Sequence, residues 1–278
     1  MPHADDGAVP AAGWDTHVHV FDGQARVAPG HYRPVHRPLA DIEALAQAHG
    51  FEHLVLVQPS VYGTDNTVLL DALRSSHGRH RGVVVVDASV SDDDLQAMHA
   101  LGVRGVRFNR VSPVGSGSGA DAAATLHALA PRLRALGWHV QWYARPQDLP
   151  DIAALHAGRA ACGVAAVLDH LAGMHAALEP HDPAWRALAE LAQQGGWIKL
   201  SGWYRLQASA PYQDLDRTIR QAAALFDAHC VWGSDWPHTA FAPDALPAYA
   251  STLAPVARAL PTTQRRPVWA LAPATLYA

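Results

Sequence analysis

Two histidines stand one residue apart in an apolar stretch near the start of the chain, residues 14–21 (WDTHVHVF). If this stretch is a β-strand, residues i and i+2 share one face, so His17 and His19 point to the same side. Such a pair can hold a metal ion or polarise one oxygen from two directions. The chain carries 18 histidines, so an ordinary pair of core or surface histidines is the alternative. The pair predicts a site only if polar residues also end later strands.

Polar and ionisable residues do follow the later candidate strands. They are Ser60 after the second, Arg107 and Asn109 in the fourth, Tyr143 in the fifth, Asp169 and His170 in the sixth, Arg205 after the seventh and Asp235 after the eighth. Simpler roles exist for some: Ser60 follows a proline and could cap a turn, Tyr143 could pack, and Arg107 could pair with Asp169. We expect Arg107 to face a binding site instead. A lone buried carboxylate such as Asp235 is costly without partners.

Strand-like and helix-like segments alternate along the chain. Strands are predicted at residues 14–21, 53–59, 82–87, 104–109, 138–143, 164–170, 197–201 and 230–235, and helices at 41–49, 66–75, 92–101, 121–136, 150–158, 183–194 and 215–226, with two more in the tail. Pro131 is predicted to kink or divide its helix. Eight such units fit an α/β fold, the (β/α)8 TIM barrel, with the active site at the carboxyl ends of the strands. An open doubly wound sheet is the alternative, weakened because no G-x-G-x-x-G turn opens a helix.

The composition describes an ordinary globular protein. The chain has 278 residues, 49% of them hydrophobic and 17% charged, and a net charge of −4, so one domain over residues 1–278 with a substantial core is expected. No footprint for nucleic acid or membrane is evident, and the oligomeric state is left open. The distant Cys162 and Cys230 predict no disulfide scaffold and no thiolate zinc site. Residues 1–13 lack the features of a secretion signal, so a cytoplasmic location is expected.

Four motifs in order resemble the second family of the amidohydrolase superfamily. They are residues 15–21 (DTHVHVF), 104–109 (RGVRFN), 168–170 (LDH) and 233–237 (GSDWP). The resemblance covers nearly the whole chain and implies a TIM barrel of the amidohydrolase type. Within the family, the chain is similar to lactonases of aromatic catabolism that open lactones such as 2-pyrone-4,6-dicarboxylate.

The resemblance implies catalytic roles for four residues. His17, His19 and His170 resemble the histidines that surround and polarise the lactone carbonyl. Asp235 resembles the carboxylate that activates water and then protonates the leaving oxygen. Ester hydrolysis needs such groups, namely a base for water, donors for the oxyanion and an acid for the leaving oxygen.

The resemblance also implies a substrate-binding set with two arginines that match carboxylates. Its members are Arg107, Arg205, Ser60, Tyr143, Tyr32 and Asn109. A further arginine of the similar lactonases falls at Pro113 in this chain, with Arg110 nearby as a candidate substitute. The full dicarboxylate specificity therefore depends on these two positions.

The same four catalytic residues could hold one divalent metal such as Zn or Mn, namely His17, His19, His170 and Asp235. The fifth-strand histidine of binuclear family members is absent, since that strand ends in residues 141–144 (QWYA). A binuclear site is therefore not expected. The similar lactonases work without a required metal, so we expect no required cofactor, with one divalent metal as the alternative.

We therefore expect a carboxylic ester hydrolase that opens a carboxylated lactone. A metal-dependent lactonase for sulfomuconolactone, muconolactone or sugar lactones is one alternative, and a related metal-dependent decarboxylase is another. A non-catalytic binding protein that kept the barrel is disfavoured by Asp235 and the three histidines, since binding alone needs no base for water.

Overall fold

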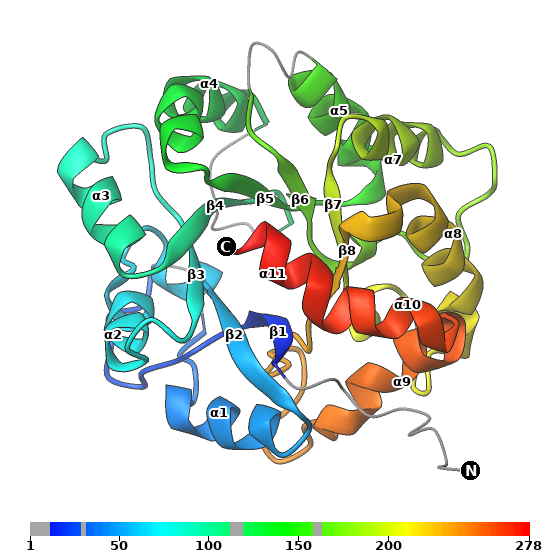
Figure 1. Ribbon diagram of the computed structural model, residues 1–278, viewed down its shortest axis with the longest axis horizontal. Coiled ribbons are helices and arrows are strands. Elements are labelled where there is room, and N and C mark those ends of the chain that lie inside the picture. The colour runs from blue at the N-terminus through cyan, green and yellow to red at the C-terminus, as the bar shows by residue number, and fades with distance from the viewer. Residues whose placement is uncertain (1–11, 29–31, 112–118, 158–162) are drawn as a thin grey trace.

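The computed structural model in Figure 1 describes residues 12–28, 32–111, 119–157 and 163–278. Eight parallel strands form one sheet, in the order in which they occur along the chain. They are β1 (Gly13–Val18), β2 (Phe51–Val57), β3 (Arg81–Val84), β4 (Val103–Asn109), β5 (His139–Tyr143), β6 (Ala166–Leu168), β7 (Trp197–Leu200) and β8 (Cys230–Trp232). Each lies within one of the predicted strands or extends it by one or two residues at the start.

The first and last strands meet and turn the sheet into a barrel. Val18 and Trp236 form a parallel bridge. The backbone N–H of His19 donates to the carbonyl of Trp236, and that of Asp235 donates to the carbonyl of His17, each at 2.9 Å. The predicted (β/α)8 barrel is thus confirmed, and the open doubly wound sheet is wrong. The same seam places three predicted catalytic residues side by side.

Helices surround the strands as an outer layer (Figure 1). They are α1 (Leu39–Gln47), α2 (Thr67–Ser75), α3 (Asp92–Ala100), α4 (Gly119–Leu136), α5 (Leu149–Ala157), α7 (Pro183–Gln193), α8 (Asp216–Phe226), α9 (Tyr249–Ala259), α10 (Thr262–Arg266) and α11 (Ala272–Leu276). One of them follows every strand, as predicted. Pro131 lies inside α4, which runs on through it rather than dividing.

The C-terminal segment lies across the end of the barrel where the strands begin (Figure 1). Tyr277 is fully buried, with its ring stacked 6.1 Å from that of Trp14 and edge-on to His139 at 5.4 Å. Arg81, at the start of β3, donates to the carbonyl of Tyr277 at 2.9 Å. This end is therefore filled, and the opposite end remains for a site.

The structure also bears on the cysteines and on membrane-spanning helices. Cys230 is buried and forms no disulfide with any described residue, whereas Cys162 lies outside the described residues. None of the helices described is both long and apolar enough to cross a bilayer.

Candidate active site

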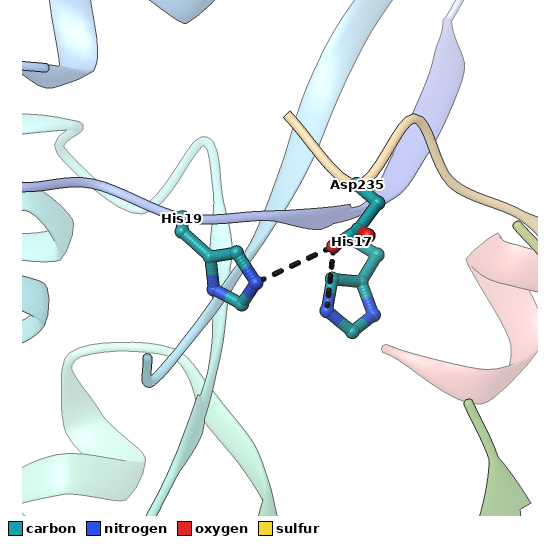
Figure 2. Close-up of side chains that lie close together, drawn as sticks. All are labelled: His17, His19 and Asp235. Carbon is teal, nitrogen blue, oxygen red and sulfur yellow. Dashed lines mark ion pairs between the residues drawn. The ribbon is translucent and has the colours of Figure 1, made fainter. Parts of the chain in front are cut away.

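Three imidazole rings converge on one carboxylate oxygen at the carboxyl ends of the strands. The Nε2 atoms of His17, His19 and His170 lie 3.7, 3.5 and 3.8 Å from Oδ1 of Asp235. Figure 2 shows two of these rings facing the carboxylate. All four side chains are buried. The structure thus brings together the four residues that the sequence predicts as catalytic.

Two of the rings are held through Nδ1 by different partners. Nδ1 of His19 lies 2.8 Å from the carbonyl oxygen of Val57, which can only accept, so this nitrogen carries the proton. Nδ1 of His170 lies 2.9 Å from the hydroxyl of Ser201, which can donate. The bond to Val57 thus fixes the orientation of the His19 ring and leaves its Nε2 facing the cluster, whereas His170 can present an N–H from Nε2.

The backbone at two of these residues is left-handed. The angle φ is 62° at Asp235 and 49° at His170, a conformation that costs about 1–2 kcal/mol outside glycine. Neighbouring glycines leave the necessary space. A Cβ added to Gly233 would lie 2.6 Å from Cβ of His17, and one on Gly202 would lie 2.4 Å from Nδ1 of His170. Strain of this kind persists where the surrounding structure imposes it, often at active sites.

The two oxygens of Asp235 differ in their surroundings. Oδ2 accepts hydrogen bonds of 2.7 Å from the hydroxyl of Tyr204 and from Nε of Arg205. Oδ1 accepts none from any residue that the structure describes. Burial raises the pKa of Asp235, but Arg205 and His170 outweigh it and hold the pKa well below its usual range. The carboxylate is therefore ionised at neutral pH, and Oδ1 can accept a proton.

A second buried carboxylate, Asp169, stands beside His17. Its Oδ1 lies 3.2 Å from Nδ1 of His17, and its Oδ2 accepts 3.0 Å hydrogen bonds from Arg107 and Gln141. Burial raises the pKa of Asp169, but His17 and Arg107 bring it well below its usual range. Arg107 thus pairs with Asp169, the simpler role considered for it in the sequence, and its guanidinium also reaches the cavity described below.

Lys199 links β7 to β1 and β5 through the barrel interior. Its Nζ donates to the carbonyl of Thr16 at 2.8 Å and to Oε1 of Gln141 at 2.7 Å, and lies 3.5 Å from Nδ1 of His17. Burial lowers the pKa of Lys199 to about 8. Burial also lowers the pKa of His17 well below 6.5 and that of His170 to about 4. Both rings are therefore neutral at pH 7.

A cavity of about 310 Å³ opens beside this cluster. His19 and Arg205 belong to both the cluster and the cavity wall. The six residues predicted to bind substrate all line the cavity, namely Arg107, Arg205, Ser60, Tyr143, Tyr32 and Asn109. Two of the described lining residues are cationic and none is acidic. The cavity therefore favours an anionic ligand.

Tyr143 is a shared contact for both arginines. The guanidinium carbons of Arg107 and Arg205 lie over its ring, 5.1 and 5.8 Å from the centre. The ring of His170 meets it edge-on at 5.1 Å. Cation–π contacts of this kind stabilise a guanidinium over an aromatic face. Tyr143 therefore orients both cationic groups of the cavity wall.

Neither of the two positions considered for a third arginine adds one to the described cavity wall. Pro113 lies outside the described residues. Arg110 forms ion pairs of 3.3 Å with Asp148 and 3.6 Å with Asp151, and it does not line the cavity. Arg107 and Arg205 are thus the arginines of the cavity in the part of the chain described.

Sequence reasoning assigned no role to Lys199, Gln141 or Tyr204. Lys199 is the single lysine of the chain and stands in the apolar strand β7. A buried amine needs partners, so its position marks a polar group across the barrel. Gln141 carries the same signal in β5. Nothing in the spacing identifies Tyr204.

Three members of the cluster also fit one divalent cation, because His17, His19 and Asp235 offer ligand atoms that all lie within 4.8 Å of one another, whereas His170 groups with His17 and Asp169 instead. At separations of 3.5–3.8 Å, none of the three Nε2 atoms forms a hydrogen bond with Oδ1 of Asp235. These separations approach the roughly 3.4 Å between neighbouring ligands of a tetrahedral zinc ion. Nε2 of His17 and Oδ1 of Asp235 are buried without a hydrogen-bond partner among the described residues. Imidazole nitrogen and carboxylate oxygen are both ligands that zinc accepts.

A barrel with a His-x-His pair at its first strand, a histidine after the sixth and an aspartate after the eighth has the site of an amidohydrolase. The chain belongs to that family, because the family model Amidohydro_2, described as Amidohydrolase, matches residues 14–278.

Individual relatives within the family include lactone hydrolases. The chain is 33% identical over 244 residues to 2-pyrone-4,6-dicarboxylate hydrolase of Comamonas testosteroni, covering 83% of this chain and 78% of the relative. It is 33% identical over 266 residues to 4-sulfomuconolactone hydrolase of Rhizobium radiobacter, covering 93% and 87%. A solved structure of a probable 2-pyrone-4,6-dicarboxylic acid hydrolase from Acinetobacter baumannii, with citric acid bound, has a TM-score of 0.81 and 26% identity, covering 96% and 99%.

Proposed function

We propose that the protein hydrolyses the ester bond of a carboxylated lactone. The observation that carries the proposal is Oδ1 of Asp235, an ionised oxygen that accepts no hydrogen bond from the described residues and is surrounded by three imidazoles. The adjoining cavity holds two guanidiniums for an anionic substrate. The two curated relatives are both named as lactone hydrolases.

Substrate binding depends on the cavity wall. Arg107 and Arg205 bind the carboxylate of the lactone, since a guanidinium keeps donors available after its Nε is used. Their Nε atoms bond to Asp169 and Asp235, which fixes each guanidinium. The polar groups of Ser60, Tyr143, Tyr32 and Asn109 hydrogen-bond the remaining oxygens of the substrate.

The attacking water lies between two acceptors. Oδ1 of Asp235 takes one proton from this water, and Nε2 of His19 accepts its second hydrogen bond. The water oxygen forms the new bond to the carbonyl carbon, and the carbonyl electron pair moves to its oxygen. Nε2–H of His170 donates to that oxyanion. When the ring C–O bond breaks, Asp235 returns its proton to the leaving oxygen, which gives the ring-opened acid.

His17 polarises the same carbonyl when its proton is on Nε2. Asp169, whose Oδ1 lies 3.2 Å from Nδ1 of His17, favours the opposite tautomer, and Lys199 acts against it. An ammonium has three donors, and two of them are bonded to Thr16 and Gln141. The third donor faces Nδ1 of His17 at 3.5 Å and Oδ1 of Asp169 at 3.7 Å. Lys199 is thus a positioning residue for the oxyanion donors.

A divalent cation is accommodated but not required. It would be held by His17, His19 and Asp235, and it would supply a Lewis acid for the carbonyl. Each carboxylate of the site is already paired with an arginine, Asp235 with Arg205 and Asp169 with Arg107. Lys199 adds a further positive charge, so the site balances its carboxylates with its own side chains.

A lactone panel tests the proposal. It contains 2-pyrone-4,6-dicarboxylate, muconolactone, 4-sulfomuconolactone and a sugar lactone, with ring opening followed by absorbance or pH change. Hydrolysis of a carboxylated lactone is expected. Release of carbon dioxide from an aromatic acid, without turnover of any lactone, would reject the proposal.

Asp235→Asn tests the assigned base. The variant is expected to lose at least about 10³-fold in kcat, because Asn cannot accept the proton. The Kd of the lactone, measured by calorimetry, should stay within threefold. Asp93→Asn, an exposed carboxylate on α3, is the matched control and should keep full activity. Retained activity in Asp235→Asn would reject its role.

Metal removal tests the cofactor expectation. After chelation and gel filtration, with metal content measured by atomic emission, kcat is expected to remain within twofold. Loss of activity that added zinc restores would show that the cation is required, and would overturn this part of the proposal.

A further inference from the structure

A second cavity, of about 170 Å³, adjoins the first at the mouth of the barrel. Phe21, Tyr32 and Thr239 line both cavities, so the two share a wall. We call the smaller one the side cavity. The rest of its wall is mainly apolar and includes Pro34, Val35, Pro237, Phe241, Pro243 and Leu246.

Exposed apolar side chains gather at the side cavity. Four large hydrophobic residues are exposed in the part of the chain described, and two of them, Tyr32 at 51% and Val35 at 49%, line it. Leaving such surface in contact with water is unfavourable, and exposed apolar patches commonly mark binding sites. An apolar group of a ligand would remove both side chains from water.

The charges of the side cavity are compatible with an anionic substrate. Arg33 and Arg37 line it, and no described lining residue is acidic. Arg33 donates to the carbonyl of Gly23 at 3.0 Å, and Arg37 donates to that of Pro243 at 3.3 Å. These bonds tie the loop between β1 and α1 to its own first turn and to the loop after β8. The two loops that form the wall of the side cavity are therefore held in place by hydrogen bonds.

We propose that the side cavity binds an apolar substituent of the lactone, about the size of one ring. A cavity of about 150 Å³ with apolar walls accommodates benzene, and the side cavity has about 170 Å³. The inference rests on the proposed function and makes it more specific. The substrate class is a carboxylated lactone with an aryl or branched alkyl substituent, its ring in the large cavity and the substituent past Tyr32.

A matched pair of substrates tests this inference, a 2-pyrone carboxylate and its phenyl-substituted analogue. The wild type is expected to show at least tenfold higher kcat/KM for the phenyl lactone, since even one methylene in an apolar pocket can change this ratio by that factor. Val35→Trp fills the side cavity, so this preference should fall to about one. Leu271→Trp, an equally exposed apolar position on the C-terminal segment, is the control and should keep the preference.

Binding separates failure of this inference from failure of the proposed function. The Kd of each lactone is measured with the Asp235→Asn variant. The Kd of the phenyl lactone is expected to be at least tenfold lower than that of the unsubstituted lactone. The two Kd values should be equal in the double variant that also carries Val35→Trp. Equal Kd values in Asp235→Asn, or equal kcat/KM in the wild type, would overturn the side-cavity assignment while lactone hydrolysis stands. If neither lactone is hydrolysed by the wild type, the proposed function fails, and the Kd comparison still decides the side cavity.

Discussion

The number of N–H donors on the side chain of Lys199 matters for the proposed chemistry of the site. The ammonium of Lys199 has three, and Thr16 and Gln141 accept two of them. The third distinguishes two tautomers of His17, one with its proton toward Asp169 and one with its proton toward the substrate. A neutral amine has two hydrogens and cannot make this third bond. We infer that the proton of Lys199 controls a donor in the proposed catalytic cluster.

We predict that kcat falls as pH rises through about 8, the pKa to which burial lowers Lys199. Below this pH the third donor is present, and above it the donor is lost. Lys199→Met should lower kcat about 10²-fold, as does loss of an oxyanion donor, and should abolish this alkaline limb. The measurement is kcat against pH for both proteins.

A direct titration provides the control for this prediction. Lys199 is the single lysine of the chain, so ¹⁵N-lysine labelling gives one side-chain NMR signal whose shift reports its pKa. A signal that titrates near 10.5, or an alkaline limb unchanged in Lys199→Met, would contradict the assignment.

Among the elements, the seam between β1 and β8 assembles the site. Asp15 fixes it, because its Oδ1 accepts from the backbone N–H of Ser234 at 2.8 Å and of His17 at 3.2 Å. Its Oδ2 accepts from the hydroxyl of Tyr249 at 2.8 Å. Burial raises the pKa of Asp15 to about 6, even though these hydrogen bonds lower it. The seam therefore contains a carboxylate whose charged form is disfavoured.

We predict that Asp15→Asn changes how stability depends on pH. The pKa of Asp15 is about 6 in the folded protein and about 3.8 unfolded, so its favourable contribution is complete below 3.8 and is lost as pH rises through 6. The loss amounts to about 3 kcal/mol. The free energy of unfolding of Asp15→Asn, relative to wild type, should therefore rise by about this amount from pH 4 to pH 7.

Urea unfolding at the two pH values makes this measurement. The exposed variant Asp93→Asn is the control, and its difference from wild type should be the same at both. If the difference for Asp15→Asn is also equal at pH 4 and pH 7, Asp15 does not titrate near 6.

The elements were predictable because apolar periodicity marks strands and helices directly. Their ends were less so. The sequence predicts strands to His170 and Asp235, whereas β6 ends at Leu168 and β8 at Trp232. His170 and Asp235 lie beyond these strands in left-handed backbone, which a non-glycine sequence does not signal. Candidate site residues were recognisable from their types and order. The partners Tyr204 and Gln141 were not, because they follow from tertiary contacts.

At the scale of the whole molecule, the two ends of the barrel have separate tasks. The carboxyl ends of the strands carry the cavity with two guanidinium groups, in a protein of net charge −4. We infer that local side chains, rather than the net charge, select the proposed anionic substrate. The opposite end is closed by the C-terminal segment, which contacts β1 and β8. Activity is therefore expected to depend on the end with the cavity, and stability on the end that the C-terminal segment closes.

Tyr277→Ala separates these tasks. The ring of Tyr277 is fully buried against Trp14 and His139 at the closed end, and truncation of a large buried aromatic leaves a cavity that costs about 3–5 kcal/mol. We predict a loss of this size in the free energy of unfolding, measured in urea, with KM for the lactone unchanged within twofold below the unfolding transition. The proposed substrate contacts lie at the other end, so binding is not expected to depend on this ring. A variant with normal stability, or one whose KM rises tenfold while it remains folded, would show that the C-terminal segment does more than close the barrel.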